Sequence, residues 1–142
     1  SDFADPKDLA KNVESARVIS KELKMKVKIR PHINEDGVKN PEYLIDEKLA
    51  DLKNIQGLGG IKHGLDSSKK QQCEYTVFNL SAFDTVEPEM LKNKLNGIYK
   101  LYGEKYSGQQ MVFIYKRKAV KVSWQDVADG KTIDLLKELQ EQ

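Results

Sequence analysis

The chain has 142 residues, of which 39% are hydrophobic and 32% charged, and its formal net charge is +2. This length and composition predict one domain, residues 1–142, with its own core and a heavily charged surface. So small a net charge does not indicate nucleic-acid binding, which has to be argued from local clusters. The single cysteine, Cys73, excludes an internal disulfide framework. No apolar run reaches the roughly 18 residues of a membrane span.

The first predicted elements are a helix and a basic strand. The helix runs from about residue 6 to 23, with Pro6 suited to its first turn. Its apolar positions recur at spacings of three and four, on a face that includes Asn12 and leaves Glu14 outside. Basic and apolar residues then alternate over 26–33, which predicts a strand with one positive face.

The middle of the chain reads as two short strands, a loop, a helix and a further strand. Residues 43–45 and 49–53 predict strands joined by a tight turn. The glycine-rich stretch 56–60 lacks the spacing of a dinucleotide fingerprint and is interpreted as a flexible loop. A short helix is expected over 67–72, and the β-formers of 75–80 predict the next strand.

The remaining residues predict a helix, a hairpin and a last helix. The helix spans about 87–106, strands at 111–115 and 119–122 form the hairpin, and the last helix covers about 132–139. We therefore predict an α/β (α+β) fold. Its core, about residues 6–80, has the order helix, three strands, helix, strand, with a mixed sheet flanked by helices. Residues 81–142 form a C-terminal extension.

Three charged side chains around the two central strands are the candidate site. Asp51 and Lys53 are two residues apart on one predicted strand, so both leave the same face. Glu42 stands at the mouth of the preceding strand. Two carboxylates close together favour a hard divalent cation such as Mg²⁺ or Mn²⁺. With a lysine to hold the attacking water or the phosphorane oxygens, this set suffices for phosphodiester hydrolysis. The alternative is a surface ion-pair cluster at a strand end.

The pair Pro41-Glu42, followed by Asp51-Leu52-Lys53, resembles the signature of the PD-(D/E)XK nucleases. Residues from about 12 to 80 look like the nuclease domains at the C-termini of bacterial contact-dependent inhibition toxins and related polymorphic toxins. Similar modules are joined to phage head-morphogenesis proteins. The resemblance covers about half of the chain. It implies that Glu42 and Asp51 bind the metal and that Lys53 is the catalytic lysine.

The resemblance implies further site residues. A glutamine should face the site from the next helix, with Gln72 or its neighbour Gln71 as the match. Many members add an acid from the first helix, and Glu14 is the available residue, although the helical face turns Asn12 toward the sheet instead. Glu42 also departs from the more usual Asp.

The resemblance also implies a place of action and a partner. The domain would act in the cytoplasm of a target cell after delivery as part of a larger secreted protein. A chain that begins at Ser1 rather than Met agrees with this expectation. Its substrate would be nucleic acid, with tRNA or other structured RNA slightly favoured over DNA, and a cognate immunity protein would bind it.

The expected nucleic-acid contacts are the cations just after the glycine-rich stretch, namely Lys62, His63, Lys69 and Lys70. No aromatic residue is interleaved among them, so no platform for base stacking is predicted.

Two other functions stay open. A metal-independent ribonuclease of the barnase–EndoU–colicin–RelE type would use His63, or His32 if it lies across from Glu42, for acid–base work. A non-enzymatic binding module would carry the same acids as plain surface charge.

Overall fold

The structure is a computed structural model that describes residues 6–30 and 43–142. The N-terminal half holds α1 (Pro6–Leu23), β1 (Val27–Ile29), β2 (Tyr43–Ile45), β3 (Lys48–Asn54), α2 (Gly59–Lys70) and β4 (Tyr75–Asn79). The C-terminal half holds α3 (Pro88–Tyr102), η1 (Gly103–Tyr106), β5 (Gln110–Tyr115), β6 (Lys118–Ser123), α4 (Trp124–Ala128), α5 (Thr132–Leu136) and η2 (Lys137–Gln140).

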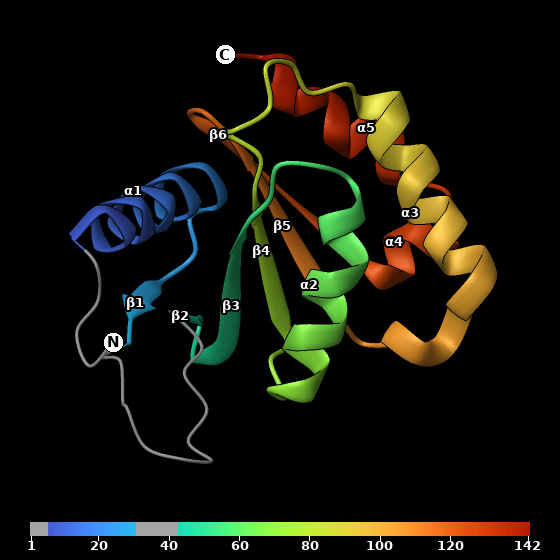
Figure 1. Cartoon of the computed structure of the whole chain (residues 1–142), viewed down its shortest axis with the longest axis horizontal. Coiled ribbons are helices and arrows are strands. Elements are labelled where there is room, and N and C mark those ends of the chain that lie inside the picture. Colours follow the sequence, from blue (N-terminus) through green and yellow to red (C-terminus); the bar gives the residue numbers. More distant parts are fainter. Residues whose placement is uncertain (1–5, 31–42) are drawn as a thin grey trace.

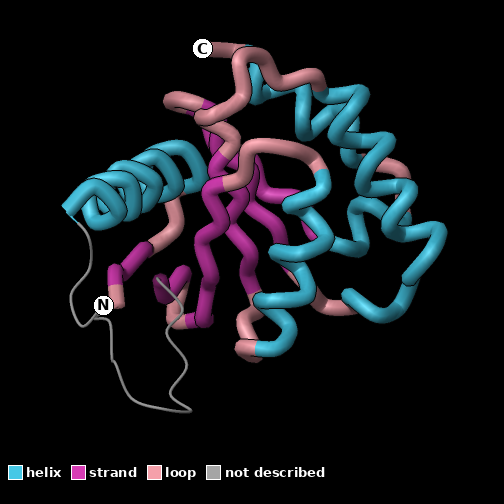
Figure 2. Tube along the Cα trace, viewed as in Figure 1, coloured by secondary structure: helices cyan, strands magenta, loops and turns pink. Residues whose placement is uncertain are grey.

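The strands form one mixed sheet in the order β1-β2-β3-β4-β5-β6. β3, β4 and β5 are parallel to one another, and the other neighbours pair antiparallel. Helix α1 covers one face of the sheet, and α2 to α5 cover the other (Figure 1). Figure 2 shows the strands as one continuous layer between the two sets of helices. The predicted fold class is therefore confirmed.

The sheet separates two apolar layers, and this determines the direction of each side chain in β3. Ala50 and Leu52 belong to the layer under α1, together with Ile19 and Tyr43. Because successive strand residues point to opposite faces, Asp51 and Lys53 lie on the face covered by α2. On that face Phe78 of β4 packs with the buried residues of α2 and α3.

The helix α2 differs from the sequence prediction, because it starts at Gly59 and not near Ser67. Glycine disfavours helices, so the stretch 56–60 indicated a loop. In the structure, glycine has no Cβ at these positions, and this lets α2 pack closely against Ile55 and Phe78. A Cβ on Gly60 would lie 2.6 Å from Ile55, and one on Gly64 would lie 2.5 Å from Phe78. The expected flexible loop is thus in part the first turn of a helix seated on the sheet.

Two smaller differences concern the C-terminal half. The helix predicted to reach Tyr106 ends as an α-helix at Tyr102 and continues as the 3₁₀ turn η1. The short helix α4 was not predicted. It begins with a capping box in which Ser123 and Asp126 bond reciprocally, 2.9 Å in each direction.

Some predictions fall outside the described residues. They concern Glu42, His32 and the part of the basic strand beyond residue 30. Among the helices of the described chain, none is both long and apolar enough to cross a membrane.

Candidate functional site

Asp51 is a buried carboxylate that collects three hydrogen-bond donors on one oxygen. The ammonium group of Lys53 lies 3.0 Å from Oδ2. Gln71 donates from Nε2 to the same oxygen at 3.1 Å, and Ser67 donates its hydroxyl at 3.3 Å. Within the described residues no donor meets Oδ1, the other oxygen of this carboxylate. A buried charge needs hydrogen-bond donors of this kind. Here all three donors from the described residues bond Oδ2, so Oδ1 is left to accept a further ligand.

Lys53 connects this buried carboxylate to the surface. The Asp51 side chain is 3% exposed, whereas 32% of the Lys53 side chain is exposed. A Cβ on Gly64 would lie 3.2 Å from Cγ of Lys53, so the glycine leaves room for the aliphatic part of the lysine beneath α2. The ammonium group is thereby held against Asp51 while still reachable from solvent.

The donors from α2 follow from helix geometry. Ser67 and Gln71 are four residues apart and therefore share one face, with Gln71 also donating to the Ser67 hydroxyl at 3.2 Å. The predicted short helix over 67–72 gave Ser67 no part in the site, so this contact was not foreseen. The i, i+4 spacing of two polar residues before a strand was the available signal.

The glutamine that contacts Asp51 is Gln71, at the C-cap of α2. Gln72 follows in a left-handed turn with φ of 60° and is exposed. That turn directs the chain from α2 into β4. Of the two glutamines that the sequence left open, Gln71 is the one whose contact with Asp51 the structure shows.

Asn12 and Glu14 lie on the opposite face of the sheet from Asp51. Glu14 is exposed, with an oxygen 3.4 Å from Arg17 of the same helix. It lines a polar cavity of about 350 Å³ that also includes Asn54 and Lys116. The main-chain oxygen of Asn12 accepts the hydroxyl of Tyr43 at 2.5 Å. The described residues therefore contain no acid from α1 beside Asp51.

The four cations expected to bind nucleic acid divide between two sides of α2. His63 and Lys70 are exposed on the outer face of α2, on either side of the turn that carries Ser67. Lys62 and Lys69 lie on the flank toward η1. There the Lys62 ammonium bonds Asp66 at 2.8 Å, and that of Lys69 donates to a main-chain oxygen in η1 at 2.7 Å.

This flank also carries aromatic rings, which come from a later part of the chain. The Lys62 ammonium lies 4.7 Å from the ring centroid of Tyr102, at the end of α3, and that of Lys105 lies 5.4 Å from it. Tyr102 and the lysines of α2 are distant in the sequence, so only the fold brings them together.

Asp66 lies at the centre of this flank. It bonds Lys62, is 3.3 Å from the ammonium of Lys105 and accepts the Tyr106 hydroxyl at 2.5 Å. Burial raises the pKa of Asp66, but the hydrogen bonds from Lys62, Tyr106 and Lys105 outweigh it and lower the pKa to about 2. Burial, followed by the bond to Asp66, raises the pKa of Tyr106 to about 12.

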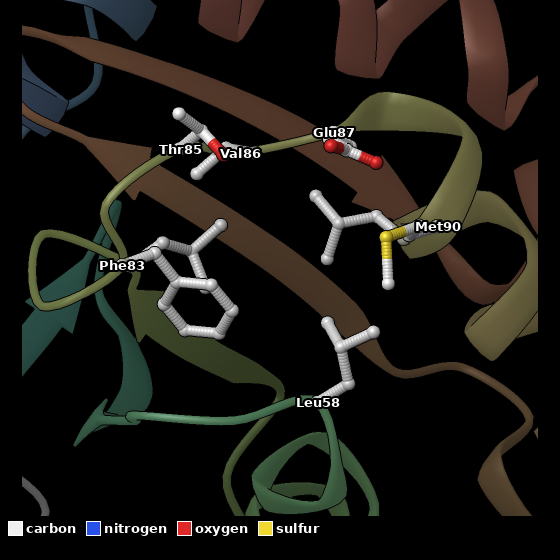
Figure 3. Close-up of a pocket in the computed structure, with 8 residues that line it drawn as sticks. Leu58, Phe83, Thr85, Val86, Glu87 and Met90 are labelled. Atoms are coloured by element: carbon white, nitrogen blue, oxygen red, sulfur yellow. The ribbon is translucent and has the colours of Figure 1, made fainter.

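A second cavity, of about 130 Å³, lies between the start of α2 and the start of α3 (Figure 3). Its lining is mostly apolar: Leu58, Leu80, Phe83, Thr85, Val86, Glu87, Met90 and Leu91. Figure 3 shows the Phe83 ring and the Met90 thioether at its rim. It lacks the grouped polar side chains that surround Asp51.

The ligands for a metal ion are incomplete within the described residues. No group of three or more His, Cys, Asp or Glu side chains that could hold an ion occurs in residues 6–30 and 43–142. Asp51 is the acid of the predicted pair that the structure describes. Glu42 immediately precedes β2 in the sequence and is outside the described residues.

Of the comparisons with known proteins, one shows the fold of the chain and one shows its family. A solved structure from Burkholderia pseudomallei, the "CdiA-CT/CdiI toxin and immunity complex", matches with a TM-score of 0.60 and 16% identity. The match covers 87% of this chain and 96% of that one, and it shows a shared fold. No curated protein matches the chain. The family model "Contact-dependent growth inhibition CdiA C-terminal domain" matches residues 39–120. The chain therefore belongs to the CdiA C-terminal domain family of contact-dependent growth inhibition.

Proposed function

We propose that this toxin domain is an endonuclease of the PD-(D/E)XK type. The observation that carries the proposal is the contact of Lys53 and Gln71 with Asp51 between β3 and α2. The element order helix, three strands, helix, strand supports it, since the signature residues would occupy that core. A plain surface ion pair is a weaker explanation, because the Asp51 side chain is almost fully buried.

Asp51 and Glu42 would hold the divalent cation of this nuclease type. The donor set fits in part. Carboxylate oxygens suit Mg²⁺ or Mn²⁺, and Oδ1 of Asp51 accepts no hydrogen bond from the described residues. When bound, the cation would neutralise negative charge that develops on the phosphate.

Lys53 would contact the phosphate group of the substrate directly. Its ammonium group reaches solvent beside a buried carboxylate, so it can meet an entering phosphate without leaving Asp51 uncompensated. A cation held there favours the additional negative charge of the transition state over the ground state. Gln71 and Ser67 would fix the orientation of Asp51. His63 and Lys70, on the outer face of α2, would contact the phosphates that flank the cleaved bond.

The biological setting follows from the family. CdiA C-terminal toxin domains are delivered into target cells, and the protein would act on RNA, with tRNA preferred, in the target cytoplasm. The matched structure is a complex of a toxin with its immunity protein. By analogy, a cognate immunity protein would bind this chain and block its activity.

The test is cleavage of total RNA and of plasmid DNA by the purified protein. Each substrate is incubated with Mg²⁺, with Mn²⁺ and with EDTA. Cleavage that requires the cation, together with the identity of the degraded polymer, supports the proposal and identifies the substrate. Cleavage that survives EDTA would contradict it and favour the metal-independent ribonuclease. Loss of neither polymer under any condition would favour a binding module.

A further inference from the structure

We infer that the ring of Tyr102, with Lys62 and Lys105, is a stacking site for an unpaired nucleotide of the substrate. The inference rests on the proposed nuclease function and assigns to it a second contact, away from the cleaved bond. Tyr102 is 40% exposed at the C-terminal end of α3. A large aromatic side chain left open to solvent between two cations is suited to a base and its phosphate.

Tyr102 is 40% exposed although two ammonium groups lie 4.7 and 5.4 Å from its ring centroid. Lys62 contacts Oδ2 of Asp66 and Lys105 contacts Oδ1, so one carboxylate holds both cations beside the ring. Tyr102 and Tyr106 form an edge-to-face contact, with ring centroids 6.3 Å apart and an interplanar angle of 71°. The exposed part of the ring is thus the surface for the base, and the two ammonium groups are the cations for its phosphate.

The site is held in place by buried groups. Tyr106 is fully buried, and its hydroxyl donates to Asp66. Asp66 in turn orients Lys62 at 2.8 Å and Lys105 at 3.3 Å. Asp66 offsets one of the two positive charges, so a net positive charge remains for a phosphate. Because the cations are positioned before binding, less side-chain entropy is lost when the nucleotide binds.

Helix α2 connects this site to the candidate active site. Ser67 faces Asp51, while its neighbour Asp66 faces the tyrosines. The exposed His63 and Lys70 lie on the surface between them. A strand that crosses α2 would travel about 10 Å, the width of one helix, from the cleaved phosphate to Tyr102. A stiff duplex keeps its bases stacked inside, so the occupant is an unpaired nucleotide in a loop or single strand.

The test measures binding of a short single-stranded RNA and of a duplex of the same sequence, each in a Lys53→Ala background that prevents cleavage. Tyr102→Ala should weaken single-strand binding about ten-fold, within the range for loss of one stacked base, and change duplex binding less than two-fold. Tyr102→Phe should bind as the parent does. The matched control is Leu101→Ala, because Leu101 directly precedes Tyr102 in α3 and is 76% exposed but has no π-face.

Three outcomes would overturn the inference: unchanged single-strand binding by Tyr102→Ala, an equal loss on the duplex, or an equal loss in Leu101→Ala. A variant that binds RNA normally but no longer binds a purified immunity protein would assign the surface to that partner. Failure of the proposed function is recognised separately, by cleavage that does not depend on Lys53. If cleavage needs Lys53 while Tyr102→Ala binds normally, only the stacking site is refuted.

Discussion

At the scale of single residues, the site is determined by which donors reach Asp51. The pair Asp51 and Lys53 could be predicted from sequence, because two residues two apart in a strand share a face. Which of Gln71 and Gln72 contacts Asp51 could not be predicted, because the direction of a side chain at a helix end depends on the residue at which the chain turns. That residue is Gln72, with its positive φ, and the turn leaves Gln71 as the partner of Asp51.

Gln71→Ala should therefore lower the rate of cleavage, and by more than Gln72→Ala does. Loss of a hydrogen bond to a charged acceptor removes about 1.5 kcal/mol. If the orientation of Asp51 matters for the transition state, this corresponds to a roughly ten-fold loss in kcat/KM. Single-turnover cleavage with both variants measures it. A larger loss in Gln72→Ala would reverse the assignment.

Asp66 should make stability depend on pH in the acid range. Its pKa is lowered from 3.8 to about 2 in the folded protein. The unfolded chain thus takes up the proton first, so the stabilisation is complete above pH 4 and is lost as the pH falls toward 2. Asp66→Asn should lower the free energy of unfolding by about 1 kcal/mol at pH 6, a modest value because the side chain is 35% exposed.

Urea unfolding at pH 6, 4, 3 and 2 measures this difference, which should shrink between pH 4 and pH 2. The control is Asp134→Asn, since Asp134 is exposed on α5. A gap between wild type and Asp66→Asn that stays constant down to pH 2 would contradict the shifted pKa.

At the scale of elements, α2 is where sequence and structure differ most. Strands β2 and β4 and helix α1 were predicted to within one residue at each end, because each has a clear apolar period and a simple boundary. The start of α2 was wrong. Glycine propensity indicated a loop, but the close approach of the helix to Ile55 and Phe78 requires glycine. Tertiary packing overrides local propensity here.

Two glycine-to-alanine changes separate packing from propensity. Gly64→Ala introduces a Cβ 2.5 Å from Phe78 and should destabilise the fold by about 1–3 kcal/mol. Gly97→Ala, on α3, meets nothing within 4 Å and should stabilise it by up to about 1 kcal/mol through helix propensity. Urea denaturation compares the two.

Equal effects of the two alanines would contradict the packing of α2 described above. Because the Gly64 position also borders the Lys53 side chain, folded Gly64→Ala should lose activity as well as stability. Gly97→Ala should retain full activity.

At the scale of the whole molecule, both the family and a mixed sheet flanked by helices could be predicted from the sequence. The surface that runs from Asp51 across α2 to Tyr102 could not. The order of strands follows from short connections: a hairpin joins β2 to β3, and crossover helices make β3, β4 and β5 parallel. The association of Tyr102 with the lysines of α2 depends on where α3 ends, which no local pattern encodes.

If the domain acts as a toxin, a cognate immunity protein should bind it. A cognate immunity protein, purified and added at equimolar concentration, should suppress cleavage by wild type, and co-expression should protect the host cell. Its contact surface should be acidic where it covers His63 and Lys70, because complementary charge speeds association. An immunity protein that binds tightly but leaves cleavage unchanged would separate binding from protection.

The central claim is that Lys53 beside Asp51 carries out phosphodiester cleavage. The most direct measurement compares single-turnover cleavage by wild type, Lys53→Ala and Lys121→Ala, the last being an exposed lysine on β6 of the same sheet. The account predicts a loss of at least 100-fold in Lys53→Ala, the scale of removing one transition-state contact, with Lys121→Ala unchanged and all three proteins equally folded. Cleavage by Lys53→Ala at the rate of wild type would contradict it.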